Sequence, residues 1–289
     1  MSGPKINDAP WLTTRTFLLL LAAALLAAFP KVALGFNTFF YRDFGAYCYP
    51  LTFFTRESFL QGQLPLWNPY SQCGVPMMAQ LGQWYPPLLG SFFLPMPWAV
   101  NFLILLHLFW GGVGMFWLVR RWNCGNLAAA IAAFAFVFNG VTLSSLIWLT
   151  YIVALAWLPW VVGCVREAWR SGGRWIVFAA IAGAMQVLAG MPEIVALTWM
   201  FVAAVWISAL VNGEIRFQSS SLRLMAIVLL VAGITMIQML PFFDLLIHSQ
   251  RNQDAGTGLW SMPAWGWANL IVPLFHCYLS PQGTWFQNG

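Results

Sequence analysis

Seven long apolar segments constrain the fold of this chain more than any other feature of its sequence. None carries an acidic residue near its middle, and each is close to the roughly 20 residues that cross a membrane as a helix. Because a helix satisfies its own backbone hydrogen bonds, it can lie in lipid. The pattern predicts an all-α integral membrane protein, a polytopic helical bundle of about seven spans. The expected spans are residues 16–36, 98–119, 127–148, 150–167, 174–190, 193–211 and 222–240.

Composition supports a lipid environment for the whole chain, 1–289, which we expect to form a single transmembrane domain. Hydrophobic residues make up 61% of the positions and charged residues 7%, against roughly 25% charged residues in soluble domains. No run of Lys or Arg exceeds two residues, so no nucleic-acid partner is expected. Six apolar segments follow the first, which we therefore interpret as a retained helix and not as a cleaved signal peptide.

The distribution of basic residues predicts which side of the membrane each connection faces. With the N-terminus in the cytoplasm and strict alternation, nine of the 13 Lys and Arg residues fall inside. Basic residues accumulate in cytoplasmic loops, so we expect this orientation in a bacterial cytoplasmic (inner) membrane. The outer basic residues are Lys31, Arg42, Arg56 and Arg251, and the outer acidic residues are Asp43, Glu57, Glu193, Asp244 and Asp254.

Two long outer connections are expected, at 37–97 and at 241–289. In the first, residues 51–61 have apolar positions at helical spacing and precede Gly62, which predicts a helix lying on the membrane surface. The following stretch, 63–97, is rich in Pro, Gly and aromatic residues. We expect it to pack against the bundle as an ordered lid.

Two shorter outer turns are expected to be compact. Gly190, Pro192 and Glu193 favour the end of one helix followed at once by the start of the next. The connection at 148–151 is so short that the third and fourth spans are expected to form a tight hairpin.

Asp43 is the strongest candidate for a catalytic group. It follows the first span directly, among aromatic residues, where a carboxylate could activate an acceptor hydroxyl or hold a divalent cation. It could equally be an exposed acid paired with Arg42. Glu193 could belong to the same site or be a helix-start charge favoured by the helix dipole. His107 lies within an apolar segment and is expected to be a packed helix residue.

The other outer residues of chemical interest each have two interpretations. Arg56 could pair with neighbouring Glu57 or contact a lipid phosphate. Arg251 could contact a lipid headgroup or a substrate phosphate. Cys48 and Cys73 fall on the same side, where a disulfide could form, and the cysteine spacing fits no zinc site.

The block LPLWNP followed by GVP, with Arg42 and Asp43 before it and the turn 188–193 further along, resembles the YfhO-like family of bacterial membrane proteins, which is placed with the GT-C-type glycosyltransferases. The resemblance covers about 35–285, and its most specific part is the block LPLWNP followed by GVP. The matching residues are Arg42, Asp43, Tyr49, Pro50, 64–69, 74–76, Ala79, Gln80, Gln83, Tyr85, Pro86, His107, 112–114, Arg120, 188–193, 238–241, Ser249 and Arg251.

The resemblance implies a GT-C-like fold in which an acid on the first outer loop, here Asp43, serves at the active site. The donor would be a sugar on a polyprenyl phosphate, and the acceptor a glycan, lipid or polymer outside the cytoplasm. Members of the family are longer, so we expect this chain to correspond to their N-terminal part. The substrate-binding residues that match by position would be Arg42, Glu193, Arg251, Trp67, Asn68, Gln83 and Tyr85. Arg56 joins them as a candidate phosphate contact because of its place on the expected surface helix.

Two other classes of function stay open from the sequence. The same scaffold could be a non-catalytic membrane subunit of a larger complex. It could also be a lipid or solute transporter, although the absence of acidic residues in the middle of the apolar segments weighs against a transport pathway. The sequence leaves open whether a divalent metal takes part.

Overall fold

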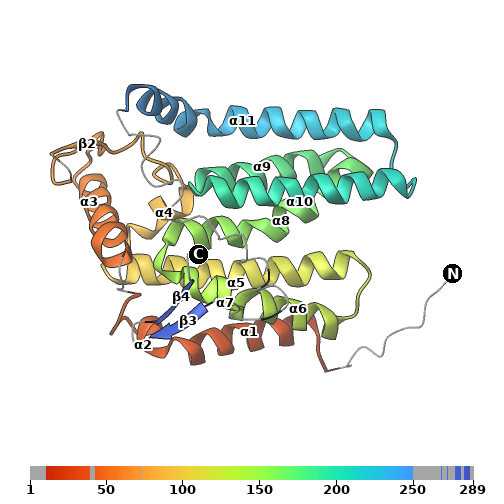
Figure 1. The fold of residues 1–289 in the computed structure, drawn as a ribbon, viewed down its shortest axis with the longest axis horizontal. Coiled ribbons are helices and arrows are strands. Elements are labelled where there is room, and N and C mark those ends of the chain that lie inside the picture. Colours follow the sequence, from red (N-terminus) through yellow and green to blue (C-terminus); the bar gives the residue numbers. More distant parts are fainter. Residues whose placement is uncertain are drawn as a thin grey trace. The chain divides into compact units, whose positions relative to one another are not determined.

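The computed structural model of the chain describes residues 11–39, 43–71, 73–249, 268, 272, 277–280 and 283–286. The chain divides into two compact units, Met1–Leu246 and Ile247–Gly289, and the first holds the helical bundle (Figure 1). The elements are α1 (Thr14–Ala28), α2 (Pro30–Ala33), a π-helical turn η1 (Phe44–Cys48), α3 (Tyr49–Leu60), β1 (Trp67–Asn68), β2 (Val75–Pro76), α4 (Pro86–Ser91), α5 (Trp98–Arg121), α6 (Asn126–Phe138), α7 (Gly140–Ser144), a 3₁₀ turn η2 (Ser145–Ile147), α8 (Leu149–Ser171), α9 (Arg174–Leu188), α10 (Pro192–Val211), α11 (Phe217–His248), β3 (Cys277–Ser280) and β4 (Gly283–Phe286).

Five helical segments of the described chain are long and apolar enough to cross a membrane: α5, the stretch Asn126–Ile147, α8, α10 and α11. These are the features of a multi-pass helical membrane protein. The two other expected spans correspond to α1 and α9, which have 15 residues each. At about 1.5 Å per residue they reach roughly 22 Å, less than the roughly 30 Å of a hydrocarbon core. A total of seven spans stays a prediction.

Helix α5 is the centre of the bundle. It packs along α6 on one side and along α8 on another, and α8 in turn packs along α9 and α10. Small residues permit this crowding, because a Cβ atom on Gly112 would lie 2.7 Å from Leu21 and one on Gly111 would lie 3.2 Å from the backbone of Ala156. Close approach at glycine is a common way for membrane helices to pack.

The expected tight hairpin of the third and fourth spans is wrong. The third span breaks at Asn139, whose Oδ1 accepts a hydrogen bond of 2.9 Å from the Thr142 amide and starts the new helix α7. The capping side chain satisfies an amide that the broken helix would otherwise leave unpaired. Helices α6 and α8 then pack mainly on α5 and not along each other.

The connections gather at two opposite ends of the bundle, as alternation predicts. One end carries the ion pairs Arg121–Glu167 (3.4 Å) and Arg170–Glu214 (3.1 Å). The other carries the first long loop, whose α3, α4 and β2 are all drawn at one end of the long helices (Figure 1). Within the first unit, the described connections assigned to one side of the membrane thus lie together, and the compartment that each end faces stays a prediction.

The first long loop is ordered, as expected. The helix predicted for residues 51–61 is α3, which ends at Leu60, two residues before Gly62 with its φ of +72°. Strands β1 and β2 pair antiparallel, and Met77 after them is fully buried. The loop is joined to the bundle by the Gly82 amide, which donates a 3.0 Å hydrogen bond to Oε1 of Gln238 in α11.

The expected end of the last span at Pro241 is wrong, since α11 continues through this residue to His248. Proline removes one backbone donor but is tolerated in membrane helices where the freed carbonyl finds another partner. The 32 residues of α11 reach about 48 Å, so this helix is longer than a hydrocarbon core is thick. The second unit, described by itself, contains an antiparallel hairpin of β3 and β4 with Ser280 opposite Gly283.

Candidate functional site

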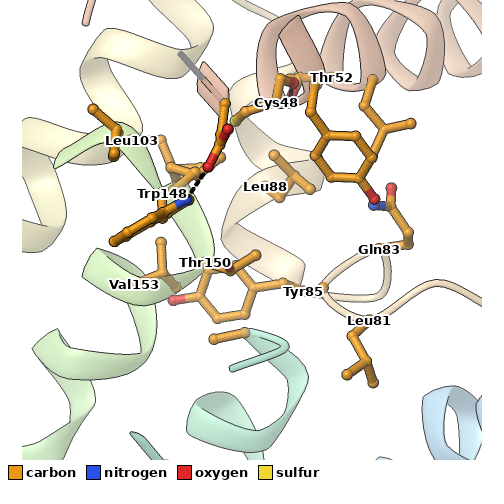
Figure 2. Close-up of a pocket in the computed structure, with 17 residues that line it drawn as sticks. Cys48, Thr52, Leu81, Gln83, Tyr85, Leu88, Leu103, Trp148, Thr150 and Val153 are labelled. Atoms are coloured by element: carbon orange, nitrogen blue, oxygen red, sulfur yellow. Dashed lines mark hydrogen bonds between the residues drawn. The ribbon is translucent and has the colours of Figure 1, made fainter. Parts of the chain in front are cut away.

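A cavity of about 150 Å³ lies where the first long loop meets the ends of the bundle helices. Its walls come from η1, α3, the loop before α4, and the starts of α5 and α8 (Figure 2). Most of the lining is apolar, and the chief apolar side chains are Leu51, Leu81, Leu88, Leu103, Leu149 and Val153. The polar groups are few, which is the usual composition of a small-molecule site.

Asp43 lines this cavity, and it is the one acidic or basic residue among the described lining residues. Nε1 of Trp148 donates a 2.7 Å hydrogen bond to Oδ2 of Asp43, the dashed line in Figure 2. This bond holds the Asp43 carboxylate to a residue that follows it by 105 positions in the sequence. Asp43 also directly precedes the π-helical turn η1, whose first residue, Phe44, is fully buried. Single π-helical turns are rare and occur frequently at functional sites.

Gln83 and Tyr85, two of the predicted substrate-binding residues, line the same cavity. Gln83 is buried, and its Oε1 lies 3.5 Å from the donating hydroxyl of Thr55. Tyr85 is only 2% exposed. The structure therefore brings together Asp43, Gln83 and Tyr85, which are separated by up to 42 residues in the sequence.

The Tyr85 hydroxyl lies in a buried chain of hydrogen bonds. It accepts a bond of 2.7 Å from Nε1 of Trp157 and is 2.6 Å from Nε2 of His107. Nδ1 of His107 is 2.7 Å from the carbonyl of Leu103. Because a carbonyl can only accept, Nδ1 of the neutral ring carries the proton and Nε2 accepts from Tyr85. His107 is thus a packed helix residue, as predicted, and it positions Tyr85.

Replacing Tyr85 with Phe is expected to destabilise the protein by about 1–3 kcal/mol, because it leaves buried polar atoms of His107 and Trp157 unpaired. Unfolding by SDS, followed by circular dichroism in micelles, measures the change. Tyr151→Phe is the matched control, since the Tyr151 hydroxyl has no partner among the described residues, and its effect should stay within about 0.5 kcal/mol. Equal losses in the two variants would contradict the proposed network.

The remaining hydroxyl and thiol groups of the cavity stay neutral. Burial raises the pKa of Cys48 to about 12 and raises the pKa of the Tyr47 and Tyr85 hydroxyls above their ordinary value. The physical cause is the cost of placing a charge where water is excluded. These groups can therefore donate or accept hydrogen bonds at neutral pH but cannot act as anions there.

Arg56 and Glu193 do not line the cavity. Nε of Arg56 donates a 2.8 Å hydrogen bond to the carbonyl of Leu94, and its Nη1 contacts Glu57 at 2.5 Å. Arg56 thereby holds α3 against the turn before α5. Glu193 is exposed in the first turn of α10, where the helix dipole favours an acidic side chain.

Trp67 and Asn68 also lie outside the cavity. Trp67 is 55% exposed and packs over Gly74, where a Cβ atom would be 2.3 Å from its ring. Asn68 is buried, and its Oδ1 accepts a 2.9 Å hydrogen bond from the Tyr70 amide, which forms a turn. The other two predicted residues, Arg42 and Arg251, lie outside the described residues.

The described residues contain no group of three or more His, Cys, Asp and Glu side chains that could hold a metal ion. A divalent cation at this cavity would therefore need oxygen atoms from substrate and water in addition to Asp43. The disulfide that the sequence allowed between Cys48 and Cys73 is not formed: both thiols are free, and Cys48 lines the cavity.

Sequence reasoning missed five residues of the cavity that come from η1, from α3 and from the start of α8 with the residue before it: Tyr47, Cys48, Thr52, Trp148 and Thr150. A signal for two of them was present, because alternation placed the turn before the fourth span at the same end as the first long loop. Nothing in the sequence indicated that the indole of Trp148 would reach Asp43.

The fold and the cavity together define a multi-pass helical membrane protein with an acidic group in an apolar cavity at one end of its bundle. Comparisons with protein-family models, with curated proteins and with solved structures each found no match.

Proposed function

We propose that this protein is a membrane glycosyltransferase of the GT-C type, which moves a sugar from a polyprenyl-phosphate donor to a glycan, lipid or polymer acceptor outside the cytoplasm. The observation that carries the proposal is the position of Asp43. Its carboxylate lies at an otherwise uncharged, mostly apolar cavity and is oriented by Trp148. The resemblance of the surrounding motifs to the YfhO-like family supports the same role.

The lining of the cavity suits this chemistry. Apolar side chains from the loop and from α5 and α8 can contact the first isoprene units of a lipid donor. One base, close to a lipid-compatible surface, is what transfer from a lipid-linked sugar needs.

The reaction that we assign to Asp43 is a displacement at the anomeric carbon of the donor. The carboxylate takes the proton of the acceptor hydroxyl, and the acceptor oxygen forms a bond to that carbon. The bond between the carbon and the phosphate oxygen breaks, and its electron pair leaves with the polyprenyl phosphate. Because the leaving phosphate gains one negative charge, a cationic group must stabilise it.

The described lining residues supply no such cation. Arg42, the chain neighbour of Asp43, is the basic residue that we propose for this role, and Arg56 is already engaged with Leu94 and Glu57. A divalent cation bound between Asp43 and the phosphate is the other arrangement that the chemistry allows.

A donor-consumption assay tests the proposed activity. The full chain in lipid nanodiscs is incubated with polyprenyl phosphates that carry radiolabelled glucose, mannose, galactose or N-acetylglucosamine, together with cell-envelope extract as the acceptor source. We expect loss of label from one donor and release of polyprenyl phosphate. Parallel reactions with EDTA decide whether a metal takes part. If folded protein consumes none of the donors, the glycosyltransferase proposal is wrong.

That negative result would favour the alternative of a non-catalytic membrane subunit. Helices α10 and α11 expose many large apolar side chains, among them Met200, Leu229 and Ile247, which fit either lipid or the helices of a partner. Copurification of a stoichiometric membrane partner, combined with no donor consumption, would establish the subunit role. Transport remains the weaker alternative.

A further inference from the structure

A second, larger depression of about 700 Å³ lies beside the cavity, between α3 and the turn that follows β1. Its volume is within the roughly 300–1,000 Å³ that is typical of ligand sites. We call it the α3 groove. Four aromatic side chains line it, Tyr47, Phe53, Phe54 and Tyr70. Tyr70 is 85% exposed and meets Phe54 edge to face, with their ring centroids 6.0 Å apart.

The polar groups of the α3 groove are mostly amides and hydroxyls. Gln61, Gln63 and Ser58 line it together with Glu57. The side chains of Gln61 and Gln63 make no hydrogen bond to other described residues. They are therefore available to a ligand that offers several hydroxyl groups.

The charge of the α3 groove argues against a phosphate ligand. Among the described residues that line it, Glu57 is the one charged side chain, and it is paired with Arg56. An anion placed there would meet a carboxylate and no lining cation. Neutral hydroxyl-rich molecules suit such a surface, because aromatic rings cover their C–H faces while amides and carboxylates bond their hydroxyls.

The α3 groove adjoins the cavity that Asp43 lines. Tyr47 and Leu51 line both of them. A chain of sugar units in the groove can therefore direct its terminal residue toward Asp43. Membrane-facing aromatic residues normally contact lipid headgroups, but the lining carboxylate and free amides fit a glycan better than a phospholipid.

We propose that the α3 groove binds a neutral oligosaccharide, the acceptor of the sugar transfer. This inference rests on the proposed function, which it deepens by naming the acceptor class and its binding surface. Tyr70 and Phe54 provide the stacking surface, and Gln61 and Gln63 hold the hydroxyls. The donor occupies the apolar cavity, so the two substrates meet at Asp43.

Equilibrium binding without turnover tests the acceptor site. The Asp43→Asn protein in nanodiscs is titrated into fluorescently tagged neutral hexasaccharides of glucose, mannose, galactose and N-acetylglucosamine, and anisotropy gives the Kd. We expect at least one hexasaccharide to bind. Tyr70→Ala, added to this background, should raise that Kd about tenfold because it removes an aromatic contact surface, whereas Tyr70→Phe, which keeps the ring, should raise it no more than about threefold.

Phe93→Ala is the matched control, because Phe93 is another 85% exposed aromatic residue that does not line the α3 groove. Its Kd should equal that of the parent. The proposal is overturned if no hexasaccharide binds, or if Tyr70→Ala and Phe93→Ala behave alike. It is also overturned if spin-labelled phospholipid quenches a fluorophore on Gln61→Cys while no sugar binds, since the groove then faces lipid.

The binding result and the donor-consumption result can fail separately. Donor consumption without oligosaccharide binding would remove the α3 groove as acceptor site and leave the glycosyltransferase function intact. Oligosaccharide binding that depends on Tyr70, without consumption of any donor, would remove the transferase function and leave a glycan-binding membrane protein.

Discussion

Replacing Asp43 with Asn is expected to lower the rate of sugar transfer by roughly 10²–10⁴-fold, the usual contribution of a general base. Asparagine keeps the size of the side chain and can still accept the hydrogen bond from Nε1 of Trp148, but it cannot take up the proton of the acceptor hydroxyl. The loss should therefore appear in kcat, with little change in folding or in donor binding. The donor-consumption assay with the preferred radiolabelled donor measures it.

Two further variants make this result specific to the site. Trp148→Phe removes the N–H group that donates a hydrogen bond to Asp43 but keeps an aromatic ring. We therefore expect a smaller loss of transfer rate, about tenfold, from poorer orientation of the carboxylate. Asp244→Asn alters an acidic residue of α11 that does not line the cavity and should leave the rate unchanged. Full activity of Asp43→Asn would exclude Asp43 as the base.

Gly190→Ala is expected to destabilise the protein by roughly 3 kcal/mol or more. Gly190 has a φ of +83°, which costs an alanine about 1–2 kcal/mol. A Cβ atom there would also lie 2.4 Å from the backbone nitrogen of Gly82. Because that neighbour is backbone, it cannot turn aside as a side chain could, and the loop that lines the cavity must move away from the turn between α9 and α10.

Gly213→Ala separates the cost of the positive φ from the cost of the close backbone contact. Gly213 has a similar φ of +69°, but nothing lies within 4 Å of its Cβ position, so only the backbone cost of about 1–2 kcal/mol should remain. SDS unfolding measures both variants. Alkylation of Cys48 at pH 8 is a second readout, since burial raises its pKa to about 12 and displacement of the loop should speed its reaction. Similar stability losses for the two glycines would show that the Gly82 contact is unimportant.

Hydropathy located the helices because each long helix must be apolar along its length to lie in lipid. The expected segment 98–119 became Trp98–Arg121, and 193–211 became Pro192–Val211. The turn at Gly190 was predicted for the right reason, since a positive φ there suits glycine alone. Hydropathy did not show the break at Asn139 or the continuation of α11 through Pro241. Both depend on which hydrogen-bond partner each backbone amide and carbonyl group finds at that position.

The candidate site was predictable only in part. Asp43 was selected from its place after the first span and from its motif, and it does line the cavity, together with Gln83 and Tyr85. The same motif included Trp67 and Asn68, which lie outside this cavity, although Asn68 lines the α3 groove. A local pattern cannot tell which of two neighbouring sites a residue faces, or whether it only builds a turn. Arg56 was assigned two roles, and its bond to Leu94 favours the structural one.

The sequence by itself determined that this chain is a helical membrane protein, where its apolar helices lie, and that the first long loop, with Asp43, shares one end of the bundle with the turns before the fourth and sixth apolar segments. These properties follow from hydropathy, charge and alternation, which act locally along the chain. Only the tertiary structure decided that Trp148 holds Asp43, that Tyr85 reaches His107 and Trp157, and that α3 and β1 enclose a groove beside the cavity. Those contacts join residues far apart in the sequence, and their geometry depends on how the helices pack.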